Sequence, residues 1–130
     1  MTVVDASAMV ELLLGTETGA RLMARLLRDE ASLHAPHLID LEVAQVLRRY
    51  SALGDLSAQR AGEALADLAD LQLHRYPHDI LMPRIWELRH NLTAYDAAYV
   101  ALAEALESPL VTCDARLASC SKRVIDVELF

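Results

Sequence analysis

The sequence predicts an α/β protein with three layers, in which helices cover both faces of a mostly parallel central sheet. Short apolar runs alternate with longer segments of helical periodicity, and this order is typical of βαβ units. Aromatic residues account for only 5% of the chain, so the core must be aliphatic, which suits helices packed on a parallel sheet. From the length of 130 residues, we expect residues 1–130 to form a single domain.

Five short segments are predicted to be strands, connected by right-handed crossovers. They are residues 2–4, 32–35, 71–76, 109–113 and 124–127. The first and fourth are apolar runs with β-branched residues, as expected of strands buried on both faces. The third alternates only weakly in polarity, which still permits a strand.

Seven segments are predicted to be helices. They cover residues 6–14, 17–28, 36–53, 57–70, 79–90, 93–106 and 114–120. Gly15 and Gly54 are expected to end the first and third of these helices. Pro36 suits the first turn of the third helix, and Pro83 must lie in the first turn of the fifth or kink it.

The composition excludes several classes of protein. A hydrophobic fraction of 54% excludes a disordered chain, and a formal net charge of −7 argues against binding nucleic acid by charge alone. No stretch reaches the roughly 18 apolar residues of a membrane span, and the N-terminal segment lacks the basic region of a signal peptide. With Cys113 and Cys120 as reduced thiols, we expect a cytoplasmic protein that does not bind a membrane.

Four carboxylates stand where a parallel sheet would bring them to one place. Asp5 and Asp114 follow the first and fourth predicted strands, and Asp96 lies in the first turn of the helix that begins near Thr93. Glu42 interrupts the apolar stripe of the third helix. Functional groups of open α/β sheets collect beyond the carboxyl ends of the strands, so we expect these four side chains to share one crevice.

Each acid also has an ordinary structural explanation. Asp5 and Asp114 could cap the helices that follow them, and Thr93 with Asp96 resembles a capping box. Glu42 could lie at the solvated edge of its helix stripe. For any one of these residues alone, the structural role stays open.

Together, the four acids indicate a metal site. Two carboxylates about 4 Å apart repel by about 4 kcal/mol at an effective dielectric near 20, and we expect no basic or histidine partner for them. Hard oxygen ligands of this kind suit Mg²⁺ or Mn²⁺. The hydroxyls of Ser7 and Thr112 either support this site or only satisfy backbone groups at helix starts.

Other chemistries fit the sequence less well. The motifs GxxxxGK[ST], GxGxxG and GxSxG are absent, which argues against common nucleotide binding and serine hydrolysis. Two pairs of histidines flank prolines without metal-ligand spacing, so we expect them at the surface or satisfied by hydrogen bonds. A phosphatase of the haloacid-dehalogenase type needs a second acid where this chain has Ser7, and a receiver-type phosphoacceptor needs paired acids after the first strand.

Four segments, in this order and at these spacings, resemble PIN-domain ribonucleases and more narrowly the VapC-type toxins of bacterial toxin–antitoxin pairs. The segments are VVDASAMVELLL, PHLIDLEVAQVLRR, LTAYDAAYVALAEAL and LVTCDARLA. The resemblance covers essentially the whole chain and implies a PIN-like three-layer α/β/α domain. It also implies that Asp5, Glu42, Asp96 and Asp114 bind Mg²⁺ or Mn²⁺ and activate water to cleave RNA, with Asp5 and Asp96 as the firmest ligands.

The same resemblance implies further contacts and partners. Thr112 and Arg116 match the threonine and arginine of the family's last motif and are candidates, with Ser7, to support the acids or contact the substrate. The family implies a homodimer, a cognate antitoxin that binds over the active site in a higher assembly, and structured RNA such as tRNA or ribosomal RNA as substrate. A non-enzymatic alternative is a catalytically silent PIN-like scaffold that acts through dimerisation and antitoxin binding.

Overall fold

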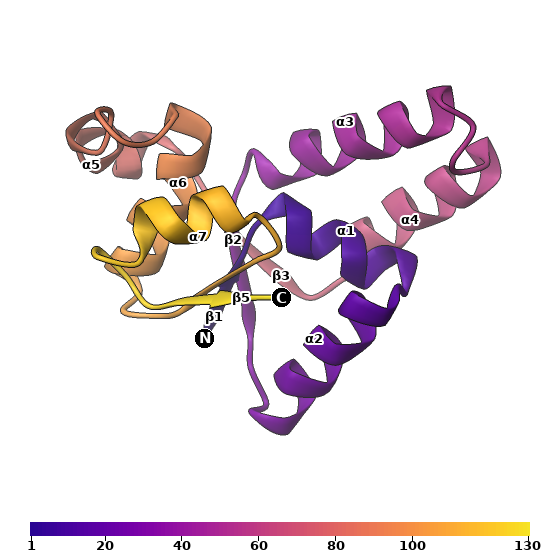
Figure 1. The fold of residues 1–130 in the computed structure, drawn as a ribbon, viewed down its shortest axis with the longest axis horizontal. Coiled ribbons are helices and arrows are strands. Elements are labelled where there is room, and N and C mark those ends of the chain that lie inside the picture. Colours follow the sequence, from indigo (N-terminus) through magenta and orange to yellow (C-terminus); the bar gives the residue numbers. More distant parts are fainter.

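The computed structural model describes residues 1–130 and contains a five-stranded sheet, with helices packed around it (Figure 1). The strands are β1 (Thr2–Val4), β2 (Leu33–Pro36), β3 (Leu73–Tyr76), β4 (Leu110–Thr112) and β5 (Val127–Leu129). All neighbouring strands run parallel, in the order β3-β2-β1-β4-β5. The predicted α/β fold with a parallel central sheet is confirmed.

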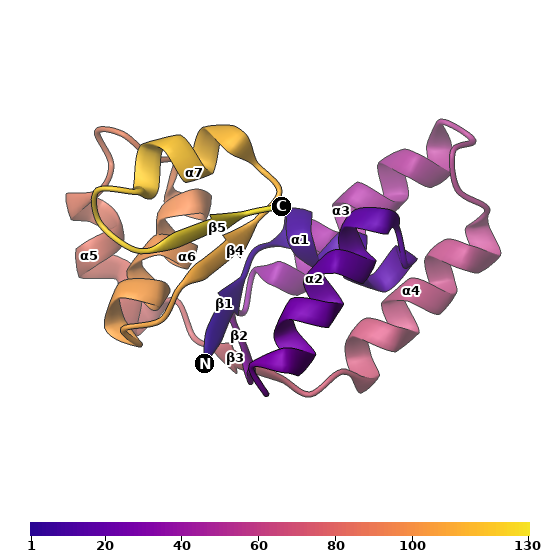
Figure 2. The ribbon, with the colours of Figure 1, turned by 60° about the horizontal axis from the view of Figure 1, so that its bottom comes forward.

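Helices form the two outer layers. They are α1 (Ala6–Leu14), α2 (Glu17–Arg28), α3 (Ile39–Ala52), α4 (Ala58–Asp70), α5 (Met82–Glu87), α6 (Ala94–Ala105) and α7 (Ala115–Ser121), with a 3₁₀ turn η1 (Asp79–Leu81) before α5. Figure 2 shows α1 to α4 on one side of the sheet and α5 to α7 on the other. None of these helices combines the length and apolar character needed to span a bilayer.

The strand order places a topological switch point between β1 and β4. From β1 the chain adds β2 and β3 toward one edge of the sheet, and then returns to add β4 and β5 on the other side of β1. Val4 is in register with Val111, so the carboxyl ends of β1 and β4 lie side by side. Ligands of open parallel sheets bind at such a point, and this is where Asp5 and Asp114 emerge.

Helix α6 is the most deeply buried of the helices. It contacts β1, β2 and β4, and every residue from Ala97 to Ala103 is buried. Alanine at four of these seven positions lets the helix approach the sheet closely, while Tyr99 and Leu102 fill the remaining space. This packing holds the first turn of α6, and with it Asp96, in a fixed place relative to the strand ends.

The connection between α1 and α2 depends on two glycines. Gly15 ends α1 in the left-handed conformation, with φ of 63°, where a residue without Cβ is favoured. Gly19 lies in the first turn of α2, directly against α1, and a Cβ atom there would overlap the backbone carbonyl of Glu11. The two helices therefore pack with backbone against backbone at this point.

The start of α3 differs from the sequence prediction. Pro36 is the last residue of β2 and is not part of the helix, which begins at Ile39. A proline is compatible with the end of a strand as well as with a first helical turn. The intervening Leu38 N–H donates to Nε2 of His78 at 2.9 Å, which satisfies one backbone donor at the helix entry.

Two further boundaries also differ. The last strand is Val127–Leu129 instead of residues 124–127, because the N–H groups of Val124 and Ile125 donate to the Ser121 carbonyl and prolong the turn after α7. The fifth predicted helix is shorter than expected and divides into η1 and α5. Pro83 lies in the first turn of α5, as predicted.

Candidate active site

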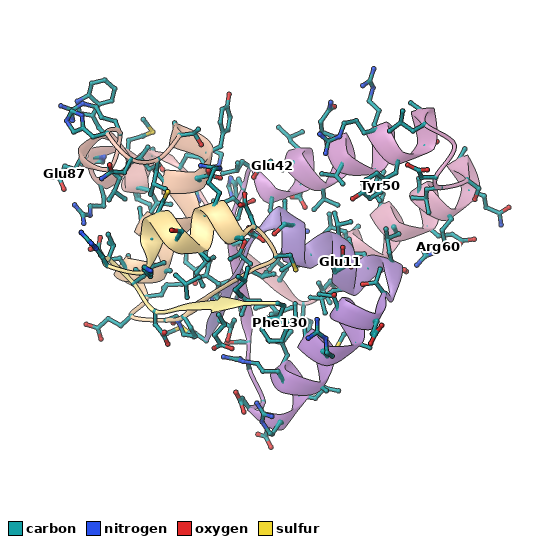
Figure 3. The ribbon with its side chains drawn as sticks, viewed as in Figure 1. Glu11, Glu42, Tyr50, Arg60, Glu87 and Phe130 are labelled. Carbon is teal, nitrogen blue, oxygen red and sulfur yellow. The ribbon has the colours of Figure 1, made fainter.

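A pocket of about 400 Å³ opens at the carboxyl ends of β1 and β4. All four acids predicted from the sequence line it, and each comes from a different part of the chain: Asp5, Glu42, Asp96 and Asp114. Figure 3 shows Glu42 at the end of α3 nearest to α6 and α7. The prediction that these side chains share one crevice is therefore met by the geometry of the pocket.

Asp5 is the most buried of the four, with 5% of its surface exposed. It caps α1 by accepting a 3.0 Å hydrogen bond from the Ala8 N–H on Oδ1. Ser7 Oγ donates to the same oxygen at 2.7 Å, and Thr112 Oγ1 donates to Oδ2 at 2.5 Å. Burial raises the pKa of Asp5 above its ordinary value, and these three hydrogen bonds oppose the rise because they favour the charged form.

Backbone N–H groups fix the two hydroxyls that serve Asp5. Ser7 Oγ accepts from the Cys113 N–H at 2.9 Å, and Thr112 Oγ1 accepts from the Asp114 N–H at 3.0 Å. With their acceptor sites directed at backbone donors, the hydroxyls direct their protons at Asp5. Both explanations considered for Ser7 and Thr112 therefore apply, since each satisfies the backbone and also orients an acid of the pocket.

Glu42 lies in the first turn of α3 and is half-buried. Its Oε1 accepts a 2.6 Å hydrogen bond from the hydroxyl of Tyr99 on α6. Burial raises the pKa of Glu42, the Tyr99 hydrogen bond lowers it, and the charges of Asp5 and Asp96 raise it further. These two acidic neighbours act on Glu42 through space, which is the like-charge conflict expected from the sequence.

Tyr99 is the main residue of the site that was not predicted from the sequence. Burial and the neighbouring Glu42 charge raise the pKa of its phenol far above the ordinary value, so the hydroxyl stays protonated and acts as a donor. A signal for it exists in the sequence, because Tyr99 follows Asp96 by three residues and therefore shares its face of the helix. Its partner on α3 is 57 residues away and carries no local signal.

Asp96 and Asp114 meet at the guanidinium of Arg116. Asp114 caps α7 by accepting from the N–H groups of Arg116 and Leu117 at 2.9 and 3.1 Å. The Arg116 Nη2 atom lies 2.6 Å from Oδ2 of Asp96 and 3.7 Å from Oδ2 of Asp114. The expectation that the acids lack a basic partner is therefore wrong, because a short helix turn brings Arg116 back over its own cap residue to reach Asp96.

The donor set of the pocket has the chemistry of a hard-cation site, but the ligands are not gathered. Four carboxylates without histidine or thiolate suit Mg²⁺ or Mn²⁺. As the side chains stand, no three acidic, histidine or cysteine groups are arranged to hold one ion. Both oxygens of Asp5 already accept hydrogen bonds, and Asp96 is engaged by Arg116. The residues fit such a cation chemically, and Arg116 engages only Oδ2 of Asp96.

The remaining pocket wall is partly apolar and includes a second arginine. Leu41 and Tyr95 line it with 76% and 67% of their surfaces exposed, so the entrance offers apolar and aromatic surface. Arg49, one turn beyond Gln45 on α3, also lines the pocket. Arg49 forms no ion pair with the acids.

The histidines take no part in this pocket. His34 is buried in β2, where its ring nitrogens contact the Tyr76 and Ser32 hydroxyls at 2.8 and 2.9 Å. It also stacks on His74 of the neighbouring strand, with ring centroids 4.8 Å apart. Burial lowers the pKa of His34, and the His74 charge adds to that effect. This histidine is satisfied by hydrogen bonds, as expected.

A parallel sheet with this strand order and an acidic pocket at its switch point is the architecture of a PIN domain, and the PIN-domain family profile matches residues 2–122. The chain belongs to the PIN-domain family. It is 44% identical over 128 residues to ribonuclease VapC1 of Mycobacterium tuberculosis, covering 98% of this chain and 96% of that protein. It is 48% identical over 117 residues to ribonuclease VapC9 of the same species, covering 90% and 88%.

A solved structure has a similar fold. The crystal structure of PAE2754 from Pyrobaculum aerophilum superimposes with a TM-score of 0.68 at 28% sequence identity. The match covers 96% of this chain and 82% of that one. The family profile and the two ribonuclease relatives confirm the family resemblance seen in the four sequence segments.

Proposed function

We propose that this chain is a metal-dependent endoribonuclease toxin of the VapC type, which hydrolyses RNA phosphodiester bonds at the acidic pocket. The observation that carries the proposal is the convergence of Asp5, Glu42, Asp96 and Asp114 on one pocket at the sheet's switch point. The relatives named as ribonucleases, at 44% and 48% identity, support the same reaction class. The enzyme would be a hydrolase that uses water to attack phosphorus in line.

In this proposal Asp5 and Asp96 hold Mg²⁺ or Mn²⁺, and Glu42 and Asp114 complete the site directly or through water. A divalent cation bound there supplies a water of lowered pKa and a positive charge for the phosphoryl oxygens. The chain itself supplies orientation: the hydroxyl of Thr112 fixes the Asp5 carboxylate. The cation also explains how a chain of net charge −7 accepts a polyanion.

Two arginines at the pocket are the candidates for contacts with RNA phosphates. Arg116 is 58% exposed at its side chain, and Arg49 lines the pocket without an acidic partner. A guanidinium binds phosphate oxygens through two parallel N–H groups. Exposed Tyr95 beside them offers a ring on which an unpaired base can stack.

The partners follow from the family. We propose a homodimer that is neutralised by a cognate antitoxin covering the acidic pocket in a higher assembly, and a cytoplasmic location where structured RNA such as tRNA or ribosomal RNA is the substrate. The exposed apolar residues at the pocket entrance, Leu41 and Tyr95, are suited to burial under a protein partner.

A catalytically silent PIN-like scaffold is the second candidate. Two observations favour it: no three potential ligands are gathered, and Asp96 is paired with Arg116. In that case dimerisation and antitoxin binding would be the whole function. Cleavage by the purified chain separates the two candidates.

The test is incubation of purified protein with total RNA in Mg²⁺, in chelator, and with two variants that each remove one negative charge. Asp96→Asn removes a proposed ligand, whereas Asp67→Asn changes an exposed residue of α4 outside the pocket. We expect cleavage only with Mg²⁺, its loss in Asp96→Asn and its retention in Asp67→Asn. Undiminished cutting in chelator or by Asp96→Asn would overturn the proposal, and sequencing the fragments' 5′ ends would identify the target.

The substitution Asp96→Asn has opposing effects on the stability of the fold. It removes repulsion from Glu42 but breaks the ion pair with Arg116. Since exposed ion pairs contribute roughly 0–1 kcal/mol, we expect only a small net change in the free energy of unfolding. Loss of activity in this variant can then be assigned to the site and not to the fold.

A further inference from the structure

We infer that Arg116 and a divalent cation compete for Asp96, so that Arg116 acts as the built-in counter-ion of the acidic pocket and sets its affinity for metal. The inference rests on the proposed function, because it needs a cation at this pocket. It identifies Arg116 as the residue that controls metal binding to the pocket. Arg116 is thus a positioning residue that acts on the site through Asp96.

The contact geometry supports this role. Arg116 is the second residue of α7, and its guanidinium lies 2.6 Å from Asp96 and 3.7 Å from Asp114. The Asp96 carboxylate makes no other side-chain contact by hydrogen bond or ion pair within the chain. Asp96 is mostly enclosed, with 18% of its side chain exposed, while 58% of the Arg116 side chain is exposed. The Arg116 guanidinium therefore reaches into the pocket from the solvent side.

The ion pair between Arg116 and Asp96 offsets negative charge in the pocket. Asp5 and Glu42 are influenced by the charges of Asp114 and Asp96 respectively, so the pocket concentrates negative charge. One guanidinium that contacts two of the four carboxylates offsets part of this repulsion when no metal is bound. The pair occupies Oδ2 of Asp96, so a metal ion that binds this oxygen must displace the guanidinium.

The arginine is able to leave. Its ion pair is exposed, and exposed pairs are weak and screened by salt. A doubly charged ion competes with a singly charged group for the same oxygen. After displacement the guanidinium is free at the pocket mouth, where it can meet a phosphate. Because linkage is reciprocal, whatever draws Arg116 away from Asp96 also strengthens metal binding.

The test measures Mn²⁺ binding by calorimetry to wild type, Arg116→Ala and Arg49→Ala. Arg49 also lines the pocket but pairs with no acid, so its removal controls for the loss of one positive charge. We expect Arg116→Ala to bind Mn²⁺ roughly two- to fivefold more tightly than wild type, the range that an exposed ion pair allows, and Arg49→Ala to change affinity much less.

Each outcome discriminates. Equal affinity in wild type and Arg116→Ala would overturn the competition and leave the proposed nuclease intact. Equal tightening in both arginine variants would also overturn it, because charge and not contact would be responsible. Failure of every protein to bind Mn²⁺ would overturn the metal-dependent function itself.

A second readout separates competition from a purely structural ion pair. In chelator, Arg116→Ala should melt at a lower temperature than wild type, because two carboxylates lose their counter-ion. Saturating Mn²⁺ should restore the Tm of Arg116→Ala, so that the metal-induced rise in Tm is larger for this variant than for wild type. A structural role alone predicts a lower Tm with the same metal-induced rise, and that result would contradict the inference.

Discussion

The hydroxyl of Thr112 donates a 2.5 Å hydrogen bond to Oδ2 of Asp5, 107 residues earlier in the chain. The bond joins the end of β4 to the end of β1, which are neighbours in the sheet. The same hydroxyl oxygen accepts the Asp114 N–H. One buried threonine therefore holds the carboxylate of Asp5 and the backbone of Asp114.

Thr112→Val keeps the side-chain volume and removes the hydroxyl. Oδ2 of Asp5 then loses its donor and the Asp114 N–H loses its acceptor, so we expect the free energy of unfolding to fall by about 1–3 kcal/mol. Urea denaturation in chelator measures this. Thr112→Ser keeps the hydroxyl but loses a buried methyl group, so it reports the packing contribution; a Thr112→Val variant as stable as wild type would show that the bond contributes nothing.

The raised pKa values of Asp5 and Glu42 predict a specific pH dependence. Their ordinary values are 3.8 and 4.5, and burial raises both in the folded protein. The folded state then binds protons more tightly than the unfolded chain, so the contribution of these groups to stability falls as pH rises from the ordinary toward the raised pKa. Above the raised pKa, the loss of stability caused by burying these two charges is complete and no longer changes with pH.

Glu42→Gln tests this dependence because glutamine cannot ionise and can still accept from Tyr99. In chelator, its stability relative to wild type should increase as pH rises above 4.5 and then level off. Glu63→Gln, at an exposed position on α4, is the control for the removal of one negative charge. Thermal melts over a pH series measure the difference, and a flat difference for Glu42→Gln would refute the prediction.

Much of the fold could be predicted from sequence because its signals are local. The valine run before Asp5 and the PLVTC run before Asp114 mark strands, and the residues at the carboxyl ends of parallel strands meet at one edge of the sheet. Gly15 and Thr93 mark a helix end and a helix start at the observed places. These local signals also sufficed to place the acids together.

The contacts that could not be predicted join distant segments of the chain. The pairing of Arg116 with Asp96 spans 20 residues and that of Tyr99 with Glu42 spans 57, and neither has a sequence period. Pro36 was misplaced because its fixed φ suits both a strand end and a first helical turn. The choice between them is made by packing in the folded chain.

Gly19 and Gly62 offer a matched pair of glycine-to-alanine substitutions in helices. Alanine at Gly62 enters open space on α4 and should stabilise the protein by about 0.5–1 kcal/mol through helix propensity. At Gly19 the same propensity gain meets a clash with the Glu11 carbonyl of α1, so we expect a net loss of about 1–3 kcal/mol. Denaturation midpoints measure both; stabilisation at both sites would mean that α1 and α2 do not pack as described.

Tyr99→Phe tests whether the phenol supports the pocket beyond filling the core. Phenylalanine keeps the buried ring, but Glu42 loses the donor that stabilises its charged form. The pKa of Glu42 should rise further, so the acidic limb of the pH profile of RNA cleavage should move to higher pH. Tyr95→Phe on the same helix is the control, because its hydroxyl makes no hydrogen bond within the chain and its ring is exposed. A profile for Tyr99→Phe that superimposes on wild type, at unchanged stability, would confine Tyr99 to a packing role and leave Glu42 without a partner that matters to the reaction.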